Sequence, residues 1–98
     1  MAHDIEALQE DIVQWLDKVH PDRTEMAVWA KLLEETGEVM TDPMDIEEWA
    51  DVIIVLLDLA MRYGHYMDDI LMTARDKLIV NKARKWTINK HGVMNHVK

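Results

Sequence analysis

The chain has 98 residues, 49% of them hydrophobic, and it contains no cysteine. This length predicts one domain, residues 1–98, with a modest core. Without cysteine, thiolate catalysis, disulfides, zinc fingers and iron–sulfur ligation are excluded, so a metal must be held by oxygen or imidazole ligands. The longest apolar run, residues 52–57, is far shorter than the about 20 residues of a membrane-spanning helix, and the acidic N-terminus does not resemble a signal peptide. We therefore expect a cytoplasmic protein with no membrane partner.

The formal charge of −8 is unevenly distributed along the chain. Residues 34–51 contain eight Asp and Glu but no Lys or Arg, whereas residues 75–98 contain seven Lys and Arg against one Asp. The first region can attract cations and the second can attract anions. Nucleic acid is not an expected partner, because its phosphate backbone would repel a chain that is negative overall.

The first two predicted helices follow apolar residues at the helical period of 3.6. One covers residues 4–19 and the other begins at residue 22, where Asp22 and Glu25 have the spacing of a capping box. The third predicted helix begins with Asp42 as N-cap and Pro43 at the first helical position, and Gly64 ends it.

The middle of the third helix, residues 52–57, is apolar all round. This pattern is typical of a central helix or of one that a second subunit covers, and we expect self-association through it into a dimer or tetramer. A fourth helix is predicted over residues 66–86, with four residues facing inward: Met67, Ile70, Ala74 and Leu78. No stretch shows strand alternation. The polar, basic tail, residues 87–98, either packs on a neighbour or stays loose. The expected fold is an all-α four-helix bundle.

Two pairs of acidic residues stand out because each pair shares one helical face. Glu35 and Glu38 are three residues apart in the second helix, and Glu48 and Asp51 are three apart in the third. A short loop makes these helices antiparallel neighbours, so the pairs lie opposite each other. Buried carboxylates must be protonated, ion-paired or metal-bound. Four oxygen ligands with open positions for water and phosphate suit Mg²⁺.

The acidic residues also carry a family resemblance. Residues 33–39, Leu-Glu-Glu-Thr-Gly-Glu-Val, followed by residues 47–51, Glu-Glu-Trp-Ala-Asp, resemble the Glu-Glu-x-x-Glu and Glu-x-x-Asp signature of MazG-type all-α nucleoside triphosphate pyrophosphohydrolases. Residues 43–64 together with Lys77, Asn81, Arg84 and Trp86 are similar to a viral branch, the dATP/dGTP pyrophosphohydrolases. The resemblance spans residues 15–86.

The resemblance implies an Mg²⁺-dependent enzyme, with Mn²⁺ as a substitute, that hydrolyses dGTP or dATP to monophosphate and pyrophosphate. It would control a nucleotide pool, in the host cytoplasm if the protein is viral. By resemblance, the metal ligands would be Glu35, Glu38, Glu48 and Asp51. Glu35 and Glu38 would be catalytic in this role. Glu34 or Glu47, next to ligands but turned about 100° around the helix, are candidates for the general base.

Cationic residues are candidates for binding the triphosphate. Lys77, Asn81 and Arg84 share one face of the fourth helix, and Lys85 follows them. They either contact phosphate or complement the helix dipole. Lys31, four residues before Glu35, is either an ion-pair partner or a phosphate contact.

Two further features have competing interpretations. Trp15 or Trp29 could stack on a purine, although a tryptophan at helical spacing is usually in the core. Asp58 either pairs with Arg62 within the third helix or orients a basic group or a water near the metal.

Other functions are also consistent with the sequence. Within the same superfamily, the protein could be a dUTP or dCTP hydrolase or a phosphoribosyl-ATP pyrophosphohydrolase. Outside it, the chain could be a non-catalytic helical module whose acidic patch binds a basic partner, or a passive buffer of divalent ions.

Overall fold

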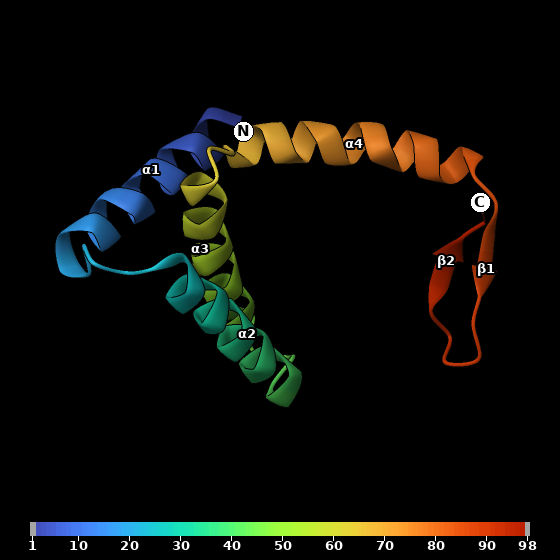
Figure 1. Ribbon diagram of the computed structural model, residues 1–98, viewed down its shortest axis with the longest axis horizontal. Helices are drawn as coiled ribbons and strands as arrows, with labels where there is room; N and C mark the ends of the chain where they lie inside the picture. Colours follow the sequence, from blue (N-terminus) through green and yellow to red (C-terminus); the bar gives the residue numbers. More distant parts are fainter. Residues whose placement is uncertain (1, 98) are drawn as a thin grey trace.

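The computed structural model describes residues 2–97, so Met1 and Lys98, the ends of the predicted domain and tail, lie outside it. Four helices, α1 (Ala2–Val19), α2 (Glu25–Thr41), α3 (Ile46–Arg62) and α4 (Met67–Ala83), precede two strands, β1 (Trp86–Ile88) and β2 (Met94–His96). The four helices confirm the predicted all-α class. Figure 1 shows α1, α2 and α3 grouped together, while α4 projects away from them. No helix among the described residues is long and apolar enough to cross a bilayer.

The start of α2 is set by Thr24, so the predicted capping box at Asp22 is wrong. The Thr24 hydroxyl accepts a hydrogen bond from the N–H of Ala27 at 3.1 Å, which satisfies one of the free N–H groups of the first turn. Asp22 lies before the helix, and the N–H of the next residue, Arg23, donates to the carbonyl of His20 at 3.3 Å. This bond closes a turn between α1 and α2.

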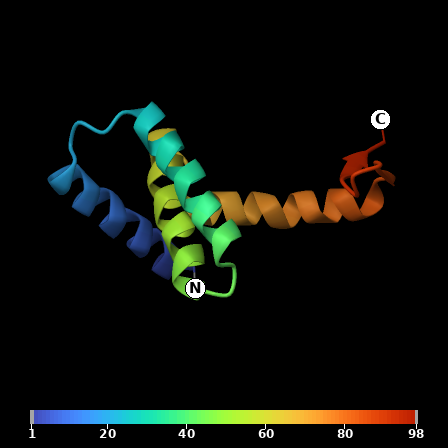
Figure 2. The ribbon, with the colours of Figure 1, turned by 90° about the horizontal axis from the view of Figure 1, so that it is seen from below.

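The predicted start of α3 at Asp42 is also wrong. Asp42 ends α2 instead, with its N–H donating to the carbonyl of Glu38 at 3.0 Å. Asp45 is the N-cap of α3, and its side chain accepts from the N–H of Glu47 at 2.9 Å. Pro43 consequently lies in the connecting turn. The connection is still short enough to place α2 and α3 side by side and antiparallel, as predicted (Figure 2).

The core lies where α1, the end of α3 and the start of α4 meet. Its buried residues are Ile12, Leu57 and Met67, with Ile5, Leu16 and Leu56 packed against them. Gln9 is fully buried beside this cluster. Its Nε2 donates to the carbonyls of Leu57 and His65 at 3.0 and 3.1 Å, and its Oε1 accepts from the N–H of Met67 at 2.8 Å. Gln9 therefore joins α1 to both helices and sets the direction in which α4 starts.

The predicted inward face of the fourth helix is confirmed only at its first residue. Met67 is buried, whereas Ile70, Ala74 and Leu78 are exposed in the single chain. The reason is that only the first part of α4 packs on α1. The rest of α4 projects away from α1, α2 and α3 (Figure 1). The molecule is consequently elongated, with a longest dimension of 46 Å. The helix ends at Ala83, before the predicted end at residue 86.

The prediction of a tail without strands is wrong, because β1 and β2 form an antiparallel hairpin at the far end of α4 (Figure 1). The side-chain oxygen of Asn89 accepts hydrogen bonds from two backbone N–H groups of the turn, at 2.9 and 3.0 Å. Gly92 supplies the positive φ of 80° that the turn requires. Strands of three residues are too short for alternation to be recognised in the sequence.

Candidate metal and nucleotide site

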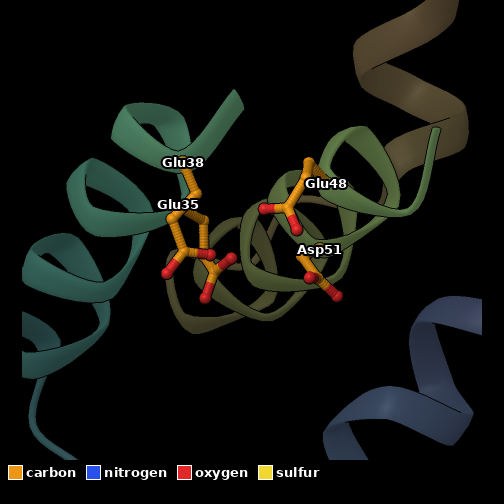
Figure 3. A group of neighbouring side chains, drawn as sticks. All are labelled: Glu35, Glu38, Glu48 and Asp51. Atoms are coloured by element: carbon orange, nitrogen blue, oxygen red, sulfur yellow. The ribbon is translucent and has the colours of Figure 1, made fainter. Parts of the chain in front are cut away.

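The two predicted carboxylate pairs converge between α2 and α3. Glu35 and Glu38 project from α2 towards Glu48 and Asp51 of α3, as Figure 3 shows. Each of the four side chains offers one carboxylate oxygen, and these oxygens lie within 4.8 Å of one another. The antiparallel packing of two i, i+3 pairs therefore produces the cluster expected from the sequence.

The cluster is poorly neutralised by its own surroundings. Glu35 is only 6% exposed, and its Oε1 lies 3.0 Å from the ammonium of Lys31. The other oxygen of Glu35 and one oxygen of Glu48 are buried without a hydrogen-bond partner. Among the described residues, Lys31 is the cation that pairs with this cluster, so one positive charge faces four carboxyl groups. An unpaired buried carboxylate oxygen is costly unless a further cation or proton meets it.

The mutual repulsion of the carboxylates also changes proton affinities. The carboxyl group of Glu35, as a hydrogen-bond partner and as a like charge, raises the pKa of Glu38, and Glu48 adds a smaller contribution. The same Glu35 carboxylate, followed by that of Glu34, raises the pKa of Lys31. The cluster thus gains from any added positive charge, whether a proton or a metal ion.

The donor set fits a hard divalent cation. All four candidate ligands offer carboxylate oxygens, and two of these oxygens are buried with no other partner. Oxygen ligands of this type, close together and open on one side, are what Mg²⁺ and Mn²⁺ prefer. The site can therefore hold one or more such ions next to a phosphate group.

A cavity of about 490 Å³ adjoins the cluster between α1, α2 and α3. It shares Glu35 and Asp51 with the carboxylate cluster and includes two of the predicted substrate residues, Trp15 and Lys31. The remaining wall consists of Leu16, His20, Arg23, Ala27, Val28, Ile54 and Val55. An apolar cavity with a few convergent charges beside a metal site is the usual form of a small-molecule site.

The interpretation of Asp58 is settled by its partner. Asp58 is 2% exposed and binds the guanidinium of Arg23 through both oxygens, at 3.0 and 2.7 Å. It therefore orients a basic group, one of the two alternatives, and it does not pair with Arg62. Arg23 itself is a cavity residue that the sequence analysis missed. The two residues are 35 positions apart, so helical periodicity carries no signal of their contact.

Other candidates lie outside the cavity wall. The indole N–H of Trp29 donates to the hydroxyl of Tyr63 at 3.0 Å, which leaves Trp15 as the tryptophan that lines the cavity. The side chain of Glu34 is 60% exposed and lies 3.6 Å from the Lys31 ammonium. Glu47 is also exposed.

The four α4-side candidates are separated from the cluster within one chain. Lys77, Asn81, Arg84 and Lys85 lie on the distal part of α4 or just beyond it. Figures 1 and 2 both show this part of α4 extending away from α2 and α3. Among the described residues, the cavity wall therefore includes none of the four.

The sequence matches the dATP/dGTP pyrophosphohydrolase family over residues 8–98. The chain belongs to this family, which confirms the resemblance found in the acidic motifs. It is 37% identical to a dATP/dGTP diphosphohydrolase of cyanophage S-2L, over 99% of this chain and 91% of that protein. It is 36% identical to a dATP/dGTP diphosphohydrolase of Salmonella phage PMBT28, over 92% of this chain but 30% of that longer protein.

A solved structure has the same architecture. It is a MazG-like pyrophosphohydrolase of cyanophage S-2L, bound to dGDP and three catalytic Mn²⁺ ions per active site. The two structures align with a TM-score of 0.78 and 39% sequence identity, covering 96% of this chain and 97% of the other. The chain therefore has a MazG-like fold.

Proposed function

We propose that the protein hydrolyses dGTP and dATP to the monophosphate and pyrophosphate. The observation that carries this proposal is the four-carboxylate cluster, whose oxygens lie within 4.8 Å beside a cavity of about 490 Å³. Family membership and the purine nucleotide bound by the S-2L neighbour support the choice of substrate. The phage origin of the relatives supports a role in the nucleotide pool of an infected cell, in its cytoplasm.

Glu35, Glu38, Glu48 and Asp51 would hold Mg²⁺, with Mn²⁺ as a substitute. A divalent ion in this position supplies charge neutralisation for the polyphosphate and activates water near neutral pH. The residues around it hold the substrate in place. The Lys31 ammonium lies 3.0 Å from Oε1 of Glu35. Once the Glu35 carboxylate binds the metal ion, this ammonium would bind a phosphate oxygen of the substrate. Glu34, or Glu47 on the facing helix, would accept the proton released by the attacking water at a carboxylate oxygen.

The base would occupy the cavity between α1, α2 and α3. Trp15 is 57% exposed and lines this wall, and Ile54 and Val55 supply apolar contact on the α3 side. Stacking on an aromatic ring and apolar burial are the usual ways to hold an unpaired base. The phosphates would then point towards Glu35 and Asp51, which the cavity shares with the cluster.

Self-association would bring the basic end of α4 in one subunit close to the carboxylate cluster of another. The radius of gyration is 16.2 Å, whereas a compact domain of this length has about 13 Å. Large apolar side chains are exposed on α3 and along α4, including Ile53, Leu71 and Ile79. Such surface is typical of a subunit interface. In a dimer or tetramer, Lys77, Asn81, Arg84 and Lys85 of one copy would reach the phosphates bound by another.

A nucleotide panel tests this function. Purified protein with Mg²⁺ is incubated with each of the four dNTPs, dUTP and phosphoribosyl-ATP, and released pyrophosphate is measured. We expect dGTP and dATP to be hydrolysed, and Glu38→Gln to lose more than about 100-fold in rate, as loss of a ligand should exceed that of an outer-shell partner. The matched control is Glu10→Gln, an exposed residue of α1. Preference for dUTP, dCTP or phosphoribosyl-ATP would contradict the substrate. Turnover retained by Glu38→Gln would contradict the site.

A further inference from the structure

A buried cation lies in the cavity wall away from the carboxylate cluster. The Arg23 side chain is 5% exposed and belongs to the same wall as Glu35 and Asp51. It enters from the turn between α1 and α2, and its partner Asp58 comes from α3. Asp58 lies seven residues after Asp51 in α3, so the pair is roughly 10 Å along the helix from the cluster. The cavity therefore has anionic ligands at one end and a guanidinium at the other.

The hydrogen bonds of Arg23 leave one donor over. A guanidinium has five N–H groups. Nε and Nη2 each donate to Asp58, while Nη1 donates to the His20 carbonyl at 3.2 Å and lies 2.9 Å from Asp17 Oδ1. The second N–H of Nη2 has no partner among the described residues. Arg23 is a residue of the cavity wall, so a ligand in the cavity is the candidate acceptor for this donor.

Stability alone does not explain this arrangement. Burying an ion pair removes both charges from water, and apolar residues of similar volume often stabilise a protein as well or better. Asp17 and Asp58 together also keep Arg23 charged, with its pKa raised chiefly by the hydrogen bond to Asp58. A rigid, permanently charged donor in a cavity wall is a suitable recognition element for a ligand acceptor.

Resting on the proposed function, we infer that Arg23 donates this N–H to N7 of the purine base. The phosphates at the carboxylate end leave the base to extend towards Arg23. N7 accepts hydrogen bonds in both adenine and guanine, whereas the neighbouring group is a donor in adenine and an acceptor in guanine. One donor aimed at N7 therefore accepts both purines. Pyrimidines have no equivalent atom, so the same contact disfavours them.

The experiment uses nucleotides in which N7 is replaced by a C–H group. Hydrolysis of dGTP and dATP is compared with that of 7-deaza-dGTP and 7-deaza-dATP by the wild-type protein. Binding of dGMP and 7-deaza-dGMP is measured in parallel from tryptophan fluorescence, which needs no turnover. Loss of one hydrogen bond to a charged donor should lower kcat/KM and affinity by about 10- to 100-fold. Equal values for each pair of nucleotides would overturn the inference.

Variants identify the donor. Arg23→Met/Asp58→Leu removes the ion pair without leaving a buried charge, and circular dichroism checks its helical content. In this variant, kcat/KM for the parent nucleotide divided by kcat/KM for its 7-deaza analogue should fall to about one, and the ratio of the two binding affinities should do the same. In the control variant His20→Ala, which alters another polar residue of the wall, the ratio should be kept. A ratio lost in His20→Ala instead would assign the contact to His20 and overturn the role of Arg23.

The outcomes separate this inference from the proposed function. If dGTP and dATP are hydrolysed but the 7-deaza analogues react equally well, only the Arg23 contact is wrong. If no nucleotide is hydrolysed, the proposed function fails, and the dGMP binding pair still decides whether Arg23 recognises N7.

Discussion

Replacing Gln9 by leucine should destabilise the protein more than any other single polar substitution in α1. Gln9 has no exposed surface, and its amide makes three hydrogen bonds, to Leu57, His65 and Met67. Leucine keeps the volume but leaves the Met67 N–H and the His65 carbonyl without partners, while the Leu57 carbonyl keeps only the bond it accepts within α3. A buried unsatisfied group costs about 1–3 kcal/mol. The bond to His65 is partly buried, so water can replace it there. The unpaired N–H of Met67 and the lost second bond of the Leu57 carbonyl together give a loss of about 3 kcal/mol.

A loss of this size is large against the about 5–15 kcal/mol that stabilises an ordinary domain. For a chain of this length it lowers Tm by about 12–24 °C. The assay is urea unfolding followed by circular dichroism at one fixed protein concentration, because self-association would otherwise shift the midpoint. The matched control is Gln14→Leu, an exposed residue of the same helix. A loss below about 1 kcal/mol, or one no greater than that of Gln14→Leu, would refute the role of Gln9 as the joint between α1, α3 and α4.

The remaining predictions concern the charged groups of the site. The pKa of Glu38 is raised above its ordinary value of 4.5, so the folded state binds this proton more tightly than the unfolded state does. In EDTA, the contribution of Glu38 to the free energy of unfolding should therefore be largest below about pH 4.5. It should fall as the pH rises through the raised pKa of this group. Glu38→Gln should flatten that slope in a series of melting curves, and an unchanged slope would contradict the assignment. Arg23→Met should cost about 3–5 kcal/mol because Asp58 is left buried and unpaired, while Arg23→Met/Asp58→Leu should recover most of the loss. Equal losses in the two variants would show that the ion pair is not the cause.

Local spacing was sufficient to predict the carboxylate cluster. Glu35 and Glu38 share a face, as do Glu48 and Asp51, and the short connection makes α2 and α3 antiparallel neighbours. These features depend on residues close in sequence, where helical geometry decides the outcome. Family membership then supports what the motifs implied about the chemistry.

Contacts between distant residues could not be predicted in the same way. Arg23 and Asp58 meet because a turn carries Arg23 back over α3, and no periodic pattern records that turn. Asp42 and Asp45 are both favourable N-cap residues. Asp42 is the C-cap of α2 instead, so Asp45 is the N-cap of α3. The apolar residues of α4 predicted burial that the single chain shows only at Met67, because an apolar stripe does not state which surface covers it.

The central claim is that Glu35, Glu38, Glu48 and Asp51 form one site for divalent cations. Titration of Mn²⁺, followed by the loss of the electron paramagnetic resonance signal of the free ion, tests it without relying on turnover. The account predicts saturable binding to the wild-type protein and to the Glu10→Gln control, and at least about 10-fold weaker binding to Glu38→Gln. Equal Mn²⁺ affinity in the wild-type protein and in Glu38→Gln, with helical content unchanged, would contradict the site and the chemistry derived from it.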